Sequence, residues 1–556
     1  MPPKVYYAPR YYNYPNLDLL SLLFDPNEHC LSADETKVHI DAANINNFLT
    51  KADCRVYAEQ FAHGLRKHYG IGANGHSQDV VVGFSTLQIL LPLAFYGTIA
   101  AGGIFSTASH SFTAAELARQ IKQGEATVLI CSPDLKDVAL QAAEICGLSR
   151  DRVLILDSTH QAWSCQAVDG SRNIWSEERL TWKRITDPDE LHNSIIGLLY
   201  SSGTTGVPKA VMLSHKMMVS QVWISSQVGR EWAIPRILNG DLRPGEMRTI
   251  AHLPAAHIAG VAGYFVSPIY AGGSVYWMGK YSWAKFRDYC KEHRITVFFT
   301  VPAIWARIAK SPDVTDHFDA LEGGAGGAAP LDANLQQSAG KRTGIQLVGT
   351  YGMSETTGSV CTLPRGMEDN TGSVGIMHPN TMFRLIDDDG NDVPEGHPGE
   401  LWVKTPTGTR GYYKNPEATA SAFTDGWYMT GDILQQRGER GLWYVTDRKK
   451  ELIKYKGIQV APAELEGFLL SHPLIEDAAV IGVPGEDTEV PRAYVVANQS
   501  KISAEQIQSL VKDKLAAYKQ LRGGVRFIDE IPRNSVGKIL RKDLRDLAKR
   551  EAGPRL

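Results

Sequence analysis

Apolar runs that alternate with amphipathic segments predict an α/β fold for most of this chain. Residues 79–84 (DVVVGF), 126–132 (ATVLICS) and 195–200 (IIGLLY) are short apolar runs typical of buried strands. A helical pattern follows such runs, as at residues 137–147 (DVALQAAEICG). Because strand and helix patterns alternate, we expect a largely parallel sheet with helices on its faces.

The pattern changes after about residue 370. Residues 383–390 (FRLIDDDG), 399–406 (GELWVKTP) and 443–453 (WYVTDRKKELI) are short runs that predict antiparallel strands. From residue 455 onward, strand and helix patterns are mixed, which predicts a small α+β domain. Residues 448–556 carry 20 basic and 15 acidic side chains, so this part is basic although the whole chain has a net charge of −3. Such a surplus suits an anionic ligand, or simply a solvated basic surface.

Composition narrows the class of protein. With 556 residues the chain is too long for one simple core, so two or more domains are expected. The net charge argues against a nucleic-acid partner. Seven scattered cysteines without a Cys-x-x-Cys pair argue against a disulfide framework or a structural zinc site. The N-terminus, MPPKVYYAPRYYNYP, lacks the pattern of a signal peptide.

Two stretches invite interpretations that we do not adopt. Residues 80–105 are long and largely apolar, but they contain Ser, Thr, Gln and several glycines, so we expect a buried strand and a buried helix instead of a membrane span. Residues 70–75 (GIGANG) match Gly-x-Gly-x-x-Gly. A dinucleotide site needs a strand before that motif and a helix after it, and here the order is reversed, so we predict a helix-ending turn.

Residues 201–209 (SSGTTGVPK) follow a predicted buried strand and carry the strongest chemical signal. Two glycines allow backbone N–H groups to converge on an anion, the hydroxyl groups add donors, and Lys209 adds a compact positive charge. The spacing is not that of a Walker A loop, because Val207 and Pro208 separate Gly206 from Lys209. We predict a phosphate-binding loop.

The stretch YSSGTTGVPKAVMLSH (residues 200–215) resembles the signature of the adenylate-forming superfamily, and further signatures follow in the expected order from about residue 40 to residue 540. The chain most resembles 4-coumarate:CoA ligases and fungal aryl- or acyl-CoA ligases. The resemblance implies an α/β fold in which the N-terminal domain, residues 1–447, has stacked mixed sheets with helices and a small β-subdomain. Residues 448–556 would form a mobile C-terminal α+β domain. Ala210 departs from the family, which usually has Gly there.

By resemblance, many residues contribute to ATP binding. YGMSETTG supplies an aromatic ring for adenine (Tyr351), a phosphate contact (Ser354) and a Mg²⁺ ligand (Glu355). Asp432 and Arg448 resemble the ribose-binding pair, since a carboxylate accepts hydrogen bonds from both ribose hydroxyls. The nucleotide-binding candidates are Ser201, Ser202, Gly203, Thr204, Thr205, Gly206, Lys209, Gly327, Ala328, Ala329, Thr350, Tyr351, Gly352, Met353, Ser354, Asp432 and Arg448.

The resemblance also assigns the remaining chemistry. Lys538 would contact the carboxylate and the α-phosphate, where a cation stabilises developing charge, and His257 would help to place the carboxylate. Lys454 is a further catalytic candidate and Lys450 is the predicted hinge. The CoA candidates are Lys280, Lys456 and Gly457, with Gln459 near the acyl-adenylate. The acyl-pocket candidates are Ala256, His257, Val261, Gly326, Gly327, Gly352, Gly358 and Ser359.

The resemblance implies two reactions: a carboxylate attacks the α-phosphate of ATP to give acyl-AMP and pyrophosphate, and CoA then displaces AMP. Ala256 is small where plant coumarate ligases carry an aromatic residue, so an aryl, arylalkyl or medium-chain acid would fit. Three alternatives stay open: an enzyme that loads a carrier protein, a luciferase-like oxygenase, and a non-catalytic nucleotide-binding scaffold. The C-terminal PRL (residues 554–556) resembles a peroxisomal address read by an import receptor, with a cytoplasmic location as the alternative.

Overall fold

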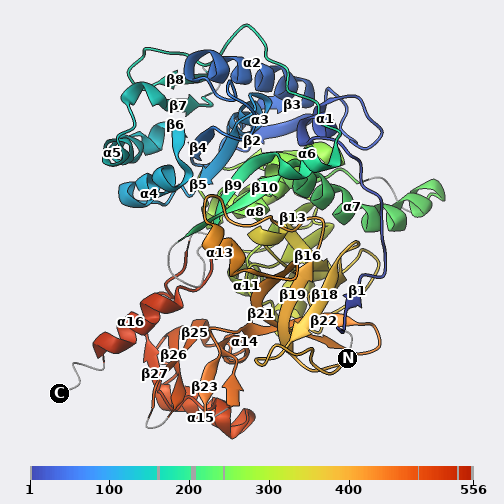
Figure 1. Ribbon diagram of the computed structural model, residues 1–556. Helices are drawn as coiled ribbons and strands as arrows, with labels where there is room; N and C mark the ends of the chain where they lie inside the picture. The colour runs from blue at the N-terminus through green and yellow to red at the C-terminus, as the bar shows by residue number, and fades with distance from the viewer. Residues whose placement is uncertain are drawn as a thin grey trace.

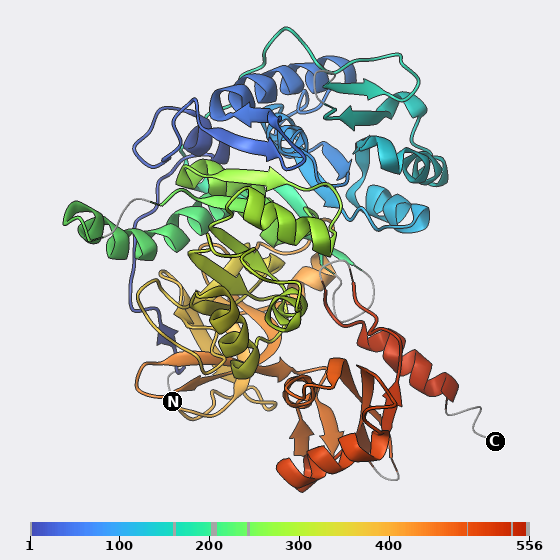
Figure 2. The ribbon, with the colours of Figure 1, turned by 180° about the vertical axis from the view of Figure 1, so that it is seen from behind.

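The computed structural model describes residues 3–159, 163–201, 208–241, 245–456, 458–485, 488–534 and 537–551, and its large N-terminal part is joined to a smaller C-terminal sheet domain (Figures 1 and 2). This arrangement confirms the predicted fold class. Several predicted residues lie outside the described ranges: Ser202, Gly203, Thr204, Thr205, Gly206, Gly457 and the C-terminal Pro554, Arg555 and Leu556.

A seven-stranded sheet holds most of the strands that the apolar runs predict. Its inner strands pair in parallel, while the strands at its two edges are antiparallel to their neighbours. In spatial order they are β10 (Lys209–Ser214), β9 (Ile195–Ser201), β5 (Ile104–Ala108), β4 (Val80–Phe84), β6 (Ala126–Cys131), β7 (Val153–Asp157) and β8 (Ser164–Ala167). Helix α2 (Lys51–Tyr69) precedes β4, and α3 (Leu91–Ala100), α4 (Ala114–Gly124) and α5 (Lys136–Cys146) connect β4, β5, β6 and β7 in turn.

Local sequence signals explain where these helices begin and end. Thr50 and Thr113 each form a capping box with the acidic residue three positions later, which satisfies backbone N–H groups of the first turn of α2 and α4. Gly70 ends α2 with a φ of 70°, so GIGANG is the helix-ending turn that we expected. Residues 80–105 form β4, α3 and β5, and no described helix has the length and apolar character of a membrane span.

Three further sheets complete the N-terminal part. The four-stranded sheet contains β11 (Arg248–Ala251), β12 (Ser274–Trp277), β2 (Lys37–Asp41) and β3 (Asn44–Thr50). The five-stranded sheet contains β13 (Val297–Thr300), β14 (Gly323–Gly326), β15 (Leu347–Met353), β16 (Gly358–Thr362) and β17 (Ile376–Met377). The antiparallel sheet contains β1 (Tyr6–Tyr7), β18 (Met382–Ile386), β19 (Gly399–Lys404), β21 (Trp427–Arg437), β20 (Phe423–Thr424) and β22 (Leu442–Arg448).

The helices of this part fill the space around these sheets (Figure 1). They are α1 (Leu19–Phe24), α6 (Pro188–Asn193), α7 (His215–Leu238), α8 (Ile258–Gly260), α9 (Ser267–Ala271), α10 (Trp283–Glu292), α11 (Pro302–Lys310), α12 (Ala333–Thr343) and α13 (Pro416–Ala420). The end of α7 projects from the body of the molecule (Figures 1 and 2).

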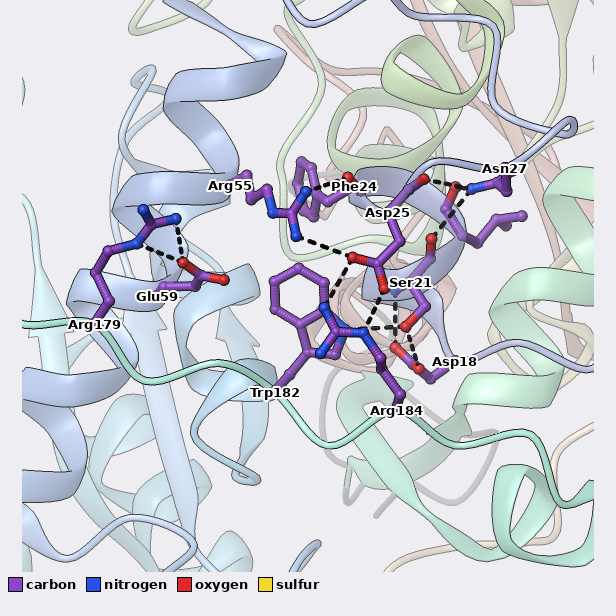
Figure 3. Close-up of polar contacts among 11 residues, drawn as sticks. Asp18, Ser21, Phe24, Asp25, Asn27, Arg55, Glu59, Arg179, Trp182 and Arg184 are labelled. Atoms are coloured by element: carbon purple, nitrogen blue, oxygen red, sulfur yellow. Dashed lines mark hydrogen bonds and ion pairs between the residues drawn. The ribbon is translucent and has the colours of Figure 1, made fainter.

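The chain between β8 and α6 is fastened to the N-terminal helices by polar contacts (Figure 3). Arg184 donates two hydrogen bonds to Asp25, at 2.7 and 3.0 Å, and the indole N–H of Trp182 donates to Ser21 at 3.0 Å. Arg179 pairs with the carboxylate of Glu59, which is almost fully buried on α2. These contacts fix the segment that leads into β9 and therefore position the start of the predicted phosphate loop.

The C-terminal part is the α+β unit that the sequence predicts, and it has its own apolar core. Its hairpin and three-stranded sheet contain β23 (Ile453–Tyr455), β24 (Ile458–Val460), β25 (Ile475–Pro484), β26 (Glu489–Ala497) and β27 (Val525–Phe527). Its helices are α14 (Pro462–Leu470), α15 (Ala504–Lys514) and α16 (Arg541–Glu551). Lys450 lies in the turn between β22 and β23, close to the predicted domain limit of 447/448, which stays a prediction.

Candidate active site

Asp432 and Arg448 face each other on neighbouring strands. They are register partners on β21 and β22, and Arg448 Nε lies 3.3 Å from Asp432 Oδ1. The hydroxyl of Tyr351, on β15, donates to Asp432 Oδ2 at 2.8 Å. Burial raises the pKa of the Asp432 carboxyl, while the charge of Arg448 and the Tyr351 hydrogen bond oppose that shift. The structure thus brings together three residues that the sequence assigned to the nucleoside.

Glu355 contacts Ser201, at the start of the predicted phosphate loop, and Tyr412, beside the end of that loop. Its Oε1 atom accepts hydrogen bonds from Ser201 Oγ and from the Tyr412 hydroxyl, both at 3.1 Å. Ser201 and Lys209 are register partners on β9 and β10, and Lys209 Nζ lies 5.1 Å from the centre of the Tyr412 ring. Lys209 and Glu355 therefore both contact Tyr412, and Glu355 also binds Ser201 at the other end of the loop.

The residues around Glu355 fit a Mg²⁺ ion only with help from a nucleotide. No group of three or more His, Cys, Asp or Glu side chains in the described ranges is arranged to hold a metal ion. A single carboxylate is nevertheless a suitable partner for Mg²⁺, which commonly binds one or two carboxylates together with substrate phosphates. Glu355 and Ser354 begin a short 3₁₀ turn directly after β15, so both lie beside the loop ends.

Two tyrosines that the sequence did not predict, Tyr412 and Tyr428, lie beside Glu355. The Tyr412 hydroxyl lies 3.3 Å from that of Tyr428, and burial beside Glu355 raises the pKa of Tyr412, so it stays a neutral donor. Only long-range pairing places Tyr412, through an isolated β-bridge to Val211. Nothing in the local sequence marks such a residue.

Lys538, in the C-terminal part, lies near enough to the nucleoside residues for their charges to act on its ammonium group. Its backbone exchanges hydrogen bonds with Asn534, and Arg533 ties the same turn to Asp477 on β25. Burial lowers the pKa of Lys538 to about 8, and the charges of Arg448, Glu451 and Asp432 act on its ammonium group.

The turn that carries Lys538 also packs against the large domain. A Cβ atom placed on Gly537 would lie 3.3 Å from a methyl group of Val301, at the start of α11. This contact holds the predicted catalytic lysine at the boundary between the two parts.

Four further predicted residues do not join this site: the CoA candidates Lys280 and Lys456, the catalytic candidate Lys454, and Gln459, which was predicted to lie near the acyl-adenylate. The backbone N–H groups of Lys454 and Lys456 donate to Glu489 and Thr488 of the C-terminal part, at 2.8 and 2.7 Å. Gln459 donates weakly to Asp388 at 3.3 Å. Lys280 is exposed and pairs with Asp134 at 3.0 Å. The described contacts of these predicted residues thus lie away from Asp432 and Glu355.

The glycine-rich candidates line the ends of β14, β15 and β16. Gly352 and Ser359 are register partners, as are Met353 and Gly358. The hydroxyls of Thr350 and Ser359 lie 2.6 Å apart.

Backbone crowding explains why small residues occupy this region. A Cβ atom on Gly352 would lie 2.0 Å from the carbonyl oxygen of Gly358, and one on Gly327 would lie 2.9 Å from the Phe299 ring. Gly326 ends β14, and Ala328 and Ala329 form the bend that follows, with a φ of 63° at Ala328.

His257 begins the short helix α8. Its Nδ1 atom accepts a hydrogen bond from the backbone N–H of Ala259 at 3.2 Å, and burial lowers its pKa to about 4. The imidazole is therefore neutral near pH 7 and serves as a hydrogen-bonding group. Ala256 precedes it, and Val261 belongs to the same core cluster as Val222 of α7, against which Phe299 packs.

Comparison with known proteins identifies the family. The sequence profile described as AMP-binding enzyme matches residues 31–413, and the profile of the AMP-binding enzyme C-terminal domain matches residues 464–538. The chain belongs to the AMP-binding enzyme family. It is 45% identical over 556 residues, with 98% of each chain covered, to a putative acyl-coenzyme A synthetase of Emericella nidulans. It is 33% identical over 545 residues to a phenylacetyl-CoA ligase of Aspergillus niger, covering 96% of this chain and 97% of the relative.

A solved structure of this family has the same fold. ATP-bound MatB from Rhodopseudomonas palustris superposes with a TM-score of 0.80 at 27% identity, covering 96% of this chain and 99% of that one. The predicted family and enzyme class, an AMP-forming acid–thiol ligase, are thereby confirmed.

Proposed function

We propose that this ligase activates an aromatic (cinnamate-, benzoate- or phenylacetate-type) or medium-chain carboxylic acid with Mg-ATP and transfers the acyl group to CoA. In the first reaction a carboxylate oxygen attacks the α-phosphorus of ATP, which forms acyl-AMP and releases pyrophosphate. In the second, the CoA thiolate attacks the acyl carbonyl, and AMP leaves with the carboxylate oxygen. The observation that carries the proposal is the place of Lys538, on a turn that lies against Val301 of the large domain, where the charges of Asp432 and Arg448 act on its ammonium group.

Each group in the site has a role that follows from its chemistry. Asp432 accepts hydrogen bonds from the ribose hydroxyls, while Tyr351 and Arg448 hold its carboxylate in place. Lys538 supplies positive charge where the carboxylate meets the α-phosphate. Glu355 would hold the Mg²⁺ that accompanies the phosphates, and the ion would neutralise part of their charge. His257 places the acid.

The distant position of Lys454, Lys456 and Gln459 supports a two-state cycle. The first reaction uses Lys538, and rotation about Lys450 would exchange it for the β23–β24 hairpin in the second reaction. The second candidate function keeps the same first reaction but transfers the acyl group to a carrier protein. The peroxisomal address at residues 554–556 remains a prediction.

We expect Asp432→Asn to raise KM for ATP by about 10- to 100-fold, because a hydrogen bond to a charged group contributes about 1.5–3 kcal/mol. The effect on kcat should be smaller, since the ribose is bound equally in the ground and transition states. The control is 2′,3′-dideoxy-ATP, which lacks the diol. Wild type should lose affinity for this analogue, and the variant should lose little more. If Asp432→Asn weakened the binding of ATP and of 2′,3′-dideoxy-ATP by the same factor, Asp432 would have a purely structural role.

The proposed function is tested by pyrophosphate release with Mg-ATP across cinnamates, benzoates, phenylacetates and hexanoate to dodecanoate, each with and without CoA. The account predicts release with at least one of these acids and a CoA thioester of the same acid by mass. Release without a thioester would favour a carrier protein. No release with any acid would overturn the proposed substrate class.

A further inference from the structure

Lys310, the last residue of α11, reaches from the N-terminal part to the C-terminal part. Its Nζ atom donates to the backbone carbonyl of Leu470 at 3.2 Å and to that of Ile475 at 3.3 Å. Leu470 is the last residue of α14, and Ile475 is the first residue of β25. One side chain of the N-terminal part therefore holds the corner at which a helix and a strand of the C-terminal part meet.

The end of α14 is a suitable place for a cation. The last carbonyl groups of an α-helix have no partner within the helix, and the aligned peptide dipoles leave partial negative charge there. The Leu470 carbonyl is one of these groups, and the ammonium group of Lys310 gives it both a hydrogen bond and a positive charge. The N-terminal part thus caps a helix that belongs to the C-terminal part.

The same face of α14 packs directly on the N-terminal part. Gly467 lies three residues before Leu470, so both residues lie on one face of the helix. A Cβ atom on Gly467 would lie 3.5 Å from the Cβ atom of Asp332, which caps the start of α12. Lys310 therefore belongs to a packed contact between the two parts.

A short chain of hydrogen bonds links this contact to Lys538. Asp477 lies on β25, the strand whose first residue accepts from Lys310, and its carboxylate binds Arg533 at 2.8 and 3.1 Å. Arg533 also donates to the carbonyl of Gly537 at 2.8 Å, and Gly537 directly precedes Lys538. The strand that Lys310 holds is thus tied to the turn that carries the predicted catalytic lysine.

The other end of α11 contacts that turn directly. Val301 caps the start of α11, and a Cβ atom on Gly537 would lie 3.3 Å from its side chain. Because α11 has nine residues, its two ends lie about 13 Å apart. Two separated contacts fix the orientation of a rigid body, whereas a single contact would leave it free to turn.

These contacts belong to one orientation of the C-terminal part. The proposed cycle rotates that part about Lys450, and the rotation carries α14 and β25 away from α11. Hydrogen bonds need donor–acceptor distances near 3 Å, so those of Lys310 do not survive this movement. A residue that stabilises only one of two orientations shifts the equilibrium toward that orientation.

We propose that Lys310 is a positioning residue for the first reaction: it clamps the C-terminal part in the orientation that presents Lys538, and it releases that part for the second reaction. The inference rests on the proposed function, because it requires two reactions that share one hinged part. Lys310 acts through the turn that carries Lys538 and not by contact with the reacting atoms.

The test follows the two reactions separately in Lys310→Met, which keeps an unbranched side chain but removes the ammonium group. Single-turnover pyrophosphate release reports the first reaction, and thioester formation from synthetic acyl-AMP and CoA reports the second. We expect the first reaction to slow about tenfold, the lower end of the effect of losing hydrogen bonds to a charged group, because Lys310 is exposed. The second reaction should be unchanged or faster, since the released orientation becomes more populated.

The opposite response of the two reactions separates a clamp from general damage. Pyrophosphate release at the wild-type rate in Lys310→Met would overturn the positioning role. Equal slowing of both reactions would also overturn it, because lost stability does not distinguish between them.

Two control variants isolate the ammonium group. Lys310→Arg keeps a cation with N–H donors and should restore most of the rate of the first reaction. Lys341→Met removes an exposed lysine from the last turn of α12 and should change neither reaction.

A double variant tests whether Lys310 acts through Lys538. In the Lys538→Ala background, Lys310→Met should slow the first reaction little further, because residues that act as one unit are not additive. A full tenfold further loss would show independent action and would overturn the positioning role. Absence of pyrophosphate release from wild type with every acid would overturn the proposed function itself, and this inference with it.

Discussion

Lys538→Ala is expected to lower kcat for acyl-adenylate formation by about 10²–10³-fold, because it removes a positive group that stabilises charge developing at the α-phosphate. Formation of thioester from supplied acyl-AMP and CoA should largely survive, since the β23–β24 hairpin serves that reaction. The measurement is single-turnover pyrophosphate release beside thioester formation from synthetic acyl-AMP. Equal losses in both reactions would contradict the division of labour between Lys538 and the hairpin.

The matched control is Lys542→Ala, which removes an exposed lysine from the first turn of α16 and should change neither reaction.

The pH dependence of the reaction gives a second test of the role of Lys538. The pKa of Lys538 is lowered to about 8, so the ammonium form that the reaction needs is lost as the pH rises through that value. We therefore expect kcat/KM for ATP to fall above pH 8, and the fall to move to higher pH in Lys538→Arg, since arginine stays charged.

Arg541→Met is expected to destabilise the C-terminal domain by about 3–5 kcal/mol, because it leaves buried carboxylate charge without its partner. Arg541 is 8% exposed, and its terminal nitrogen donates to both oxygens of Glu466 at 2.7 Å. The same side chain pairs with Glu451 at 3.1 Å and donates to the carbonyl of Val480 at 3.3 Å. It thus joins α16 to α14, β25 and the segment after Lys450.

Hydrogen exchange measures this loss in the full chain, where unfolding of two domains need not be two-state. The amide of Val480, which donates to Glu466, should lose protection in Arg541→Met. The control is Lys542→Met, at the exposed residue next to Arg541, which should leave the protection of Val480 unchanged. Removing both charges with Glu466→Met and Arg541→Met should recover much of the stability. Unchanged protection at Val480 in the single variant would show that the buried pair does not hold the domain together.

The sequence predicted those parts of the fold that local patterns encode. The strand at residues 195–200 and the turn at residues 70–75 follow from apolar runs and glycine placement within a few residues. It also predicted that Asp432 and Arg448 act together, although only their register on β21 and β22 brings them within contact distance. The prediction that these two residues act together came from the resemblance to the family and not from a local pattern.

Other features depend on contacts that no local pattern announces. Tyr412 lies in a loop that pairs with Val211 of β10, and this pairing places its hydroxyl beside Glu355. Val211 and Tyr412 are far apart along the chain, so no local pattern predicts the contact. Whether Lys456 or Lys538 faces Asp432 depends on how the C-terminal part is oriented, and residue types do not encode that orientation.

The central claim is that an acyl-adenylate links the acid to the thioester, and isotope transfer tests it most directly. Wild type is incubated with Mg-ATP, CoA and an active acid whose carboxylate carries two ¹⁸O atoms, and the AMP is analysed by mass. The account predicts AMP with one ¹⁸O atom, because the attacking carboxylate oxygen stays on phosphorus when the thiol displaces AMP. Unlabelled AMP, or ADP in its place, would contradict the account.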